Sequence, residues 1–225
     1  AEDQDIEAEI VTRDDYARLA EFDALFIRVT TAVNHFTFRF ASRAQAEGLV
    51  VVDDPRSILR CTNKVYLAEL LDRHGLLAPK TIIVHRDNLD EVCAVLGFPI
   101  ILKQPDSAFS QGVTKVTSRE ELEIEATKLF ADTELLVAQE FIATDFDWRI
   151  GVLDRRPLYA CKYFMARKHW KIMVKDADGD TDYGKVEAVP MERVPAFVVH
   201  AAVRAASLIG DGFYGVDLKQ VGRSA

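Results

Sequence analysis

The stretch that decides the fold is Phe98-Pro99-Ile100-Ile101-Leu102-Lys103, followed by Gln104-Pro105-Asp106-Ser107-Ala108-Phe109-Ser110-Gln111-Gly112. An apolar strand ends at Lys103, and a polar loop with hydroxyls, an amide and a glycine follows it. An ammonium, hydroxyls and backbone N–H groups placed in this way can converge on phosphate oxygens. The loop is not a Walker A sequence, and a strand-end lysine in water would give the same pattern. The candidate phosphate contacts are Lys103, Ser110, Gln111 and Gly112.

A second lysine, Lys64, opens a helix that we expect to begin at Thr62 or Asn63 and to end at His74, with Gly75 as its C-cap. A lysine in the first turn is slightly unfavourable beside the positive end of the helix dipole, which favours a functional role over a structural one. Two cations from different elements are what a triphosphate needs on its opposite sides. Lys64 and Lys103 are therefore the predicted pair of phosphate-binding lysines.

Composition limits the classes of protein that the chain can represent. Its 225 residues are 49% hydrophobic, enough for a real core, and the net charge of -8 argues against general nucleic-acid binding. No run of roughly 18 apolar residues is present, and the first residues are acidic where a signal peptide would be basic, so we expect a cytoplasmic location and no membrane partner. The three cysteines have no C-x-x-C spacing and indicate neither a disulfide framework nor a zinc site.

One segment reverses the acidic average. Residues 155–175 contain seven bases and no acid, and Trp170 lies among them. This is where an anionic ligand would be sought, although a solvated β-hairpin is the plain alternative. A base-rich segment with an aromatic residue also leaves open the binding of RNA or of an anionic peptide.

The elements expected along the chain alternate between helix and strand. Helices are predicted over residues 14–20, 35–47, 62–74, 87–96, from Ser118 and over 194–209; strands are predicted over 24–28, 49–52, 80–84, 98–103, 114–116, 135–142, 147–153, 158–164 and 213–219. The first two strands and the helix between them suggest part of a βαβ unit with a parallel sheet. Ser118 followed by Glu121 is a capping-box pattern. The loop at residues 176–180 has the D-x-D-x-D pattern of half a calcium loop but lacks the remainder of an EF-hand.

Three later motifs complete the pattern. In Gln139-Glu140-Phe141-Ile142, backbone groups at a strand end could hydrogen-bond an adenine edge, or the segment could be an ordinary strand end. Asp147 and Arg149 are two residues apart and share one strand face. Asp217 lies in the strand Gly215-Val216-Asp217-Leu218, and a carboxylate is a ligand that magnesium prefers.

In this order the motifs resemble those of the ATP-grasp superfamily, and within it the RimK-type and glutathione-synthetase-like carboxylate-amine ligases. The resemblance covers roughly residues 22–219. It implies an α+β (α/β) fold in which two lobes clamp ATP: part of a pre-ATP-grasp α/β domain at residues 1–54, a first lobe at 55–138 and a second at 139–225. It assigns ATP to Lys64, Lys103, Ser110, Gln111, Gly112, Gln139, Glu140, Phe141, Ile142 and Asp147; the substrate to Arg149, Lys162 and Lys171; and magnesium to Asp217. Lys162 and Lys103 would be the catalytic cations.

The chain departs from the family pattern at several positions. Lys162 stands where related ligases usually carry an arginine facing the acyl phosphate, and Trp170-Lys171-Ile172-Met173 stands where an aromatic-Arg-x-Asn sequence is common. Lysine keeps the charge but loses the bidentate fork. The E-x-N sequence that completes the metal site in the family does not follow Asp217. We expect from this that the chain is clipped before that strand and at its N-terminus, and that it is a poor catalyst in this form.

The resemblance implies an ATP- and Mg-dependent ligase that joins a carboxylate to an amine through an acyl phosphate. The substrates would be small molecules or peptides, with glutamate-like residues or peptides favoured as acceptors by the basic segment. The alternatives are a nucleotide-binding module without ligase chemistry, and a protein that binds anionic peptides or RNA. The oligomeric state does not follow from the sequence.

Overall fold

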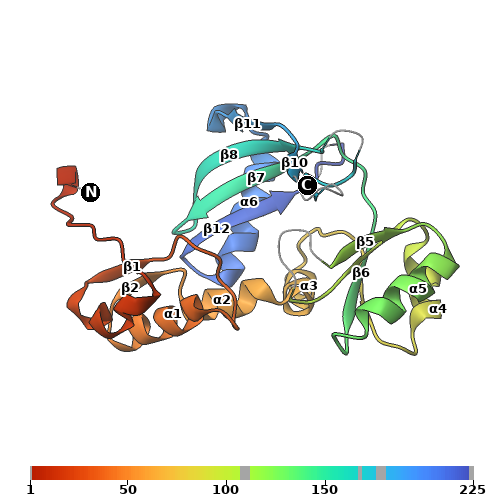
Figure 1. The fold of residues 1–225 in the computed structure, drawn as a ribbon. Helices are drawn as coiled ribbons and strands as arrows, with labels where there is room; N and C mark the ends of the chain where they lie inside the picture. The colour runs from red at the N-terminus through yellow and green to blue at the C-terminus, as the bar shows by residue number, and fades with distance from the viewer. Residues whose placement is uncertain (1, 107–111, 167–168, 176–180, 223–225) are drawn as a thin grey trace. The chain divides into compact units, whose positions relative to one another are not determined.

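The computed structural model describes residues 2–106, 112–166, 169–175 and 181–222 (Figure 1). The chain divides into two compact units, Ala1–Leu59 and Arg60–Ala225, which are described separately. The mixture of helices with parallel and antiparallel sheets confirms the α+β prediction.

The first unit is built on a small parallel sheet. Its elements are η1 (Glu2–Gln4), η2 (Arg13–Glu21), β1 (Ala24–Phe26), α1 (Phe36–Ala46) and β2 (Val50–Val52). Strands β1 and β2 pair in parallel, and helix α1 lies between them in the chain, as expected of a βαβ unit. Leu19, Leu25, Phe40 and Ala44 form its buried core.

Helix α2 (Pro55–Thr62) was not predicted. The Asp54 carboxylate accepts hydrogen bonds from the backbone N–H groups of Arg56 (2.9 Å) and Ser57 (3.0 Å), so the acid that suggested a simple boundary caps a helix. Pro55 at the first helical position supports the same start.

In the second unit, the first four-stranded sheet has the order β3-β6-β4-β5 with antiparallel neighbours throughout. Its elements are α3 (Lys64–Arg73), β3 (Thr81–Val84), α4 (Leu89–Leu96), β4 (Ile100–Lys103), β5 (Val113–Val116), α5 (Arg119–Leu129) and β6 (Leu136–Glu140). Helices α4 and α5 contact each other and pack on this sheet (Figure 1). The core between them includes Ile100, Leu102, Leu122 and Leu136, all fully buried.

The second four-stranded sheet has the order β11-β8-β7-β12, also antiparallel. Its strands are β7 (Phe146–Leu153), β8 (Arg156–Phe164), β11 (Val186–Val189) and β12 (Phe213–Leu218); η3 (Met191–Arg193) and α6 (Ala196–Ile209) complete this part, and β9 (Met173–Lys175) pairs with β10 (Thr181–Tyr183). Helix α6 covers one face of the second sheet with Val198, Ala202 and Ala206, spaced one helical turn apart. The face of this sheet that α6 leaves uncovered carries Asp147, Arg149 and Asp217.

The expected lobe boundary at residue 138 falls inside β6, which pairs with β3 and β4 along its whole length. The compact units of the structure divide at residue 59, whereas the sequence suggested 54. The division into a partial first domain and two lobes stays a prediction.

Candidate nucleotide site

Lys103 is the most buried cation of the candidate site. It ends β4, and the neighbouring strands β5 and β6 place Val113 and Val137 beside it in register. Its ammonium donates to the side-chain oxygen of Gln139, and the Gln139 amide nitrogen in turn donates to Thr81 Oγ1 (2.9 Å). The pKa of Lys103 is lowered to about 8, mainly by burial and also by the ammonium groups of Lys64 and Lys219, while the Asp147 carboxylate opposes the shift.

Lys64 is held against the loop that follows β4. Its backbone N–H donates to the Pro105 carbonyl (3.0 Å), and its ammonium donates to the same oxygen (3.3 Å). Asn63 caps α3 by accepting from Tyr66 N–H (3.0 Å), and its amide nitrogen reaches Asp106 Oδ1 (3.3 Å). Burial lowers the pKa of Lys64, and the charge of Asp106 opposes this. The structure therefore brings the two predicted lysines close enough to affect each other's charge.

A third lysine, Lys219, belongs to this cluster and was not predicted. Its ammonium donates to Asp147 Oδ1 (2.7 Å) and Thr144 Oγ1 (3.0 Å), and Thr144 Oγ1 also donates to Asp147 Oδ1 (2.9 Å). Lys219 follows the end of β12 by one residue, and Asp147 is the second residue of β7, which pairs with β12. The two-residue spacing from Asp217 to Lys219 was the available clue, because alternate strand residues share a face.

Lys219 lines a cavity of about 370 Å³ with aromatic and basic walls. It is lined by Lys115, Phe141, Ile142, Ala143, Thr144, Met165, His169, Trp170 and Lys219. The Phe141 and Trp170 rings meet edge to face with 6.0 Å between centroids, and the Lys115 ammonium lies 4.3 Å from the Phe141 centroid. A cavity of this size with flat apolar side chains suits a planar heterocycle.

The backbone at the end of β6 is partly available to such a ligand. Glu140 N–H donates to Lys80 O (3.0 Å) and Phe141 N–H to Pro99 O (3.2 Å), so these two donors are already used. Within the described residues no backbone carbonyl accepts from Ile142 N–H, which lines the cavity. The Glu140 carboxylate accepts a hydrogen bond from Lys80 N–H (2.7 Å), so this side chain is already engaged outside the cavity.

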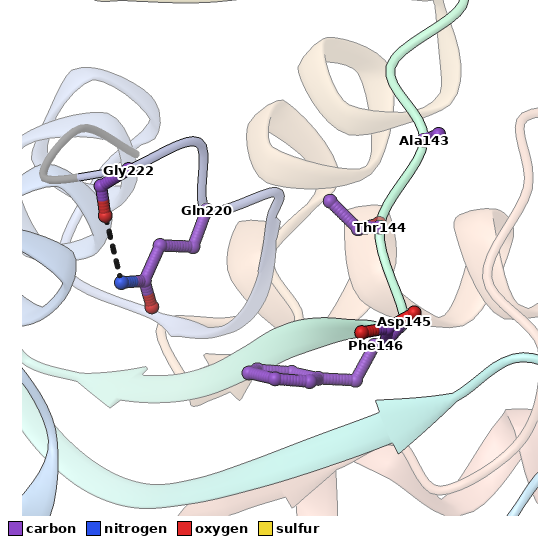
Figure 2. Close-up of a pocket in the computed structure, with 6 residues that line it drawn as sticks. All are labelled: Ala143, Thr144, Asp145, Phe146, Gln220 and Gly222. Atoms are coloured by element: carbon purple, nitrogen blue, oxygen red, sulfur yellow. Dashed lines mark hydrogen bonds between the residues drawn. The ribbon is translucent and has the colours of Figure 1, made fainter.

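A second cavity, of about 420 Å³, adjoins the first. Figure 2 shows its walls: Ala143, Thr144, Asp145 and Phe146 on one chain segment, and Gln220 and Gly222 on the other. The Gln220 amide nitrogen donates to the Gly222 carbonyl (3.1 Å), which fixes the turn on that side. Ala143 and Thr144 line both cavities. A ligand longer than one heterocycle can therefore extend along the 143–146 segment.

The open face of the second sheet carries two residues that were predicted separately, Arg149 as a substrate contact and Asp217 as a magnesium ligand. They are register partners, and Arg149 donates from Nε to Asp217 Oδ1 and from Nη2 to Oδ2 (2.7 Å). The Arg149 guanidinium also lies 5.1 Å from the Tyr163 ring centroid. The described residues hold no group of three His, Cys, Asp or Glu side chains that could bind a metal ion. Since Arg149 holds both oxygens of Asp217, and Lys219 holds Asp147 on the same face, the described residues do not fit a magnesium site as they stand.

Lys162 lies on the other face of the sheet. Its register partner is Trp148, and its ammonium is 4.5 Å from the Phe146 centroid and 5.1 Å from the Trp148 centroid. Alternate residues of a strand point to opposite faces, so Lys162 is separated from Asp147 and Arg149. The structure does not bring it to the other predicted site residues.

Lys171 contacts the first sheet instead of pointing along the second. Its ammonium donates to the Val113 carbonyl (2.7 Å), and its backbone N–H donates to His169 Nδ1 (3.0 Å). Burial lowers the pKa of Lys171. Lys171 is thus held beside β5.

The predicted loop contacts Ser110 and Gln111, and the acidic loop 176–180, lie outside the described residues. Gly112 is described: its φ is +59°, and a Cβ there would collide with the side chain of Gln104. Gln104 N–H donates to the Gly112 carbonyl (3.0 Å), which closes the base of the loop. The positive φ favours glycine at this position.

No helix among the described residues is long and apolar enough to cross a membrane.

Comparisons with known proteins identify one matching family and several similar ligases. The family model described as D-ala D-ala ligase C-terminus matches residues 73–218, more than half of the chain. The alpha-aminoadipate–LysW ligase LysX of Sulfurisphaera tokodaii is 25% identical over 174 residues (74% of this chain, 57% of the relative). A protein named "Probable alpha-L-glutamate ligase" from Maridesulfovibrio salexigens is 27% identical over 207 residues (89% and 65%). The chain thus spans about three fifths of the length of these curated relatives.

Among solved structures, the D-alanine–D-alanine ligase of Bacillus anthracis complexed with ATP matches with a TM-score of 0.72 at 18% identity, covering 96% of this chain and 70% of that one. A RimK domain ATP-grasp protein from Sphaerobacter thermophilus matches with a TM-score of 0.68 at 19% identity, covering 90% and 70%. At these identities the structures show the fold, which confirms the ATP-grasp prediction. The chain belongs to the D-ala D-ala ligase C-terminus family and has the fold of the ATP-grasp carboxylate-amine ligases.

Proposed function

We propose that this protein binds ATP and uses it to join a carboxylate to an amine. The observation that carries the proposal is the cluster of Lys64, Lys103 and Lys219 near an aromatic cavity that Lys219 lines. Asp147 acts on Lys103 and Lys219, and Asp106 acts on Lys64. Ammonium groups that are partly removed from water repel one another and lose hydration, and a bound polyanion relieves both costs. A nucleotide triphosphate combines such an anion with a planar base.

The nucleotide would lie with its base against Phe141 and Trp170 in the aromatic cavity and its phosphates toward Lys64 and Lys103. Ile142 N–H would donate to the base edge. Asp147 would accept from the ribose, because a carboxylate has about four acceptor sites and only Oδ1 is used among the described residues. Gln139 would orient Lys103 through its side-chain oxygen.

The proposed reaction has two steps, and the lysines offset negative charge in the first. A substrate carboxylate attacks the γ-phosphorus, ADP leaves, and an acyl phosphate forms. The amine then attacks the acyl carbon and loses a proton. The bond between the acyl carbon and the phosphate oxygen breaks, and inorganic phosphate leaves. Lys103 and Lys64 stabilise the negative charge that develops on the phosphoryl oxygens during the first step. The family resemblance implies magnesium as the companion of ATP. The described residues do not fit a magnesium site, so both steps are written for the residues of this chain alone.

An acidic amino acid is the favoured substrate class. Two relatives carry alpha-aminoadipate and alpha-L-glutamate in their names, and the sequence of residues 155–175 contains seven bases and no acid. A small molecule or a peptide could carry the accepting amine. The role predicted for Lys162 has no support from its position, whereas Arg149 lies on the open face and remains the proposed substrate contact.

The test is ADP release with magnesium-ATP and pooled amino acids and acidic peptides, with Lys103→Ala as the control variant. Release that depends on the pool and disappears in the variant would support a ligase, and dividing the pool would then identify the substrate.

One observation favours a second candidate function, a nucleotide-binding module without ligase chemistry. The acid predicted to hold magnesium is neutralised by Arg149. ATP binding without ADP release for any pool would support this candidate and reject the ligase proposal for this chain.

A further inference from the structure

Lys219 occupies a position where three parts of the site meet. Its ammonium contacts Asp147 and Thr144, and its side chain lines the cavity that contains Phe141 and Trp170. The next residue, Gln220, lines the second cavity (Figure 2). Lys219 therefore lies where the two cavities adjoin.

The ammonium of Lys219 is well fixed. Its side chain is 31% exposed and that of Asp147 is 14% exposed, so the pair is largely shielded from water. Two acceptors at 2.7 and 3.0 Å hold the ammonium, and Thr144 also bonds to the carboxylate, so the three groups form a closed triangle. A cation held in this way needs little reorganisation when a ligand binds.

Lys219 and Lys103 approach Asp147 from different sheets. Both Lys219 and Asp147 influence the charge state of Lys103, in opposite directions, so all three lie within electrostatic range. Because the Asp147 carboxylate offsets only one of the two ammonium charges of Lys103 and Lys219, this pair keeps a positive charge. The ligand chemistry that such a centre favours is an anion placed between Lys103 and Lys219.

We propose that Lys219 is a further nucleotide-binding residue, whose ammonium, positioned by Asp147 and Thr144, binds the phosphate groups of a nucleotide whose base lies in the aromatic cavity. The inference rests on the proposed ATP site and adds to it a cation from the second sheet. Asp147 then has two roles: Oδ1 orients Lys219, and Oδ2, which has no hydrogen-bond partner among the described residues, accepts from the ribose.

The experiment measures the binding of adenosine, AMP, ADP and ATP by calorimetry in EDTA, for the full chain and for Lys219→Met and Lys219→Arg. Lys185→Met is the matched control, because Lys185 is 71% exposed and pairs with Glu187 on the same sheet. In Lys219→Met we expect adenosine affinity within about twofold of wild type and ATP affinity lower by roughly tenfold or more, the size of one charge-assisted hydrogen bond. Lys219→Arg should recover most of the loss.

A second measurement separates phosphate binding from the positioning of Asp147. If Lys219 acts on phosphate, Lys219→Met should still weaken ATP binding in an Asp147→Asn background. An independent check is the pKa of Lys103, followed by lysine side-chain NMR in the ligand-free protein. This pKa should rise in Lys219→Met because a like charge has been removed.

Four outcomes would overturn the inference. Equal losses for adenosine and ATP, or a loss that vanishes in Asp147→Asn, would assign Lys219 to the ribose side only. Unchanged ATP affinity in Lys219→Met would remove it from the site while leaving the proposed function intact. If the wild-type chain binds none of the four ligands, the proposed function itself fails, and the inference fails with it.

Discussion

Arg149 and Asp217 are register partners on β7 and β12, and the guanidinium donates to both oxygens of the carboxylate. A divalent ion can reach Asp217 only if this pair opens. Removing one partner of a half-buried ion pair leaves the other charge uncompensated, so a freed Asp217 should seek a cation.

We therefore expect Arg149→Gln to bind Mn²⁺ more tightly than wild type, by roughly tenfold, since the variant loses a competing cation and one positive charge. Electron paramagnetic resonance of free Mn²⁺ would measure the affinity without any turnover. Arg204→Gln, at an exposed position of α6, is the control with the same charge change. Equal Mn²⁺ affinity in wild type and Arg149→Gln would mean that the ion pair does not control access to Asp217.

Lys103→Ala should lower turnover by about 10²- to 10³-fold, because it removes a preorganised electrostatic partner of the developing phosphoryl charge. Single-turnover ADP formation with the substrate from the pooled assay would measure this. Lys128→Ala is the control, since Lys128 is 63% exposed on α5. A Lys103→Ala rate within about twofold of wild type would remove Lys103 from the mechanism.

Stability should rise with pH in a defined window. Burial lowers the pKa of Lys103 from its ordinary value of 10.5 to about 8. Between these values the unfolded chain binds more protons than the folded one, so the free energy of unfolding increases with pH, by at most about 3 kcal/mol. Urea unfolding of wild type and Lys103→Met between pH 7.5 and about 10.5 would isolate this contribution. Parallel pH profiles for the two proteins would contradict it.

Nucleotide affinity should show the opposite pH dependence. A phosphate group favours the charged form of Lys103, so binding should weaken as pH rises above about 8 and the ligand-free ammonium loses its proton. Adenosine, which has no phosphate, should not show this loss. Calorimetric titrations of ATP and adenosine at pH 7 and about 9 would compare them.

Trp170 offers an optical test of the proposed base position. The chain has two tryptophans, and Trp148 is 3% exposed in the core of the second sheet. ATP should change the fluorescence of wild type through stacking near Trp170. The change should disappear in Trp170→Phe while calorimetry still detects binding, and its persistence there would place the base elsewhere.

The core beneath Lys103 should be sensitive to a cavity. Leu102 is fully buried beside Ile100 and Leu136, so Leu102→Ala should lower the free energy of unfolding by about 2–5 kcal/mol. Leu77→Ala, where the side chain is 77% exposed, should stay within about 0.5 kcal/mol. Urea denaturation would give both values, and similar losses would show that Leu102 is not part of a tightly packed core.

Local patterns predicted much of this fold because their physical causes are local. Ser118 accepts from Glu121 N–H (3.2 Å) at the start of α5, as its capping pattern indicated. The Glu121 carboxylate, however, bonds to Thr117 N–H (2.6 Å), one residue earlier than a standard capping box. Asn63 caps α3 where the helix was expected to begin.

The site residues that were predicted wrongly or not at all are those whose neighbours depend on pairing between strands. Lys219 joins the site because β12 pairs with β7 and so places Lys219 beside Asp147. Lys162 leaves it because the register of β7 and β8 sets it opposite Trp148. A shift of one residue in register exchanges the two faces of a strand, and nothing in the local sequence fixes that register.

Helix α3 connects the loop that follows β4 with the hydrophobic core of the second sheet. Its first residue bonds to the Pro105 carbonyl in the loop after β4, while Leu67 and Leu70, farther along the same helix, pack on the core of the second sheet. A helix is stiff over this length. We therefore expect a displacement at Pro105 to tilt α3 against the hydrophobic core. Substitutions at Leu67 or Leu70, far from any phosphate, should therefore alter the placement of Lys64 as well as the melting temperature. Variation in this core is a route by which the protein can tune its ligand affinity without altering a single ligand contact.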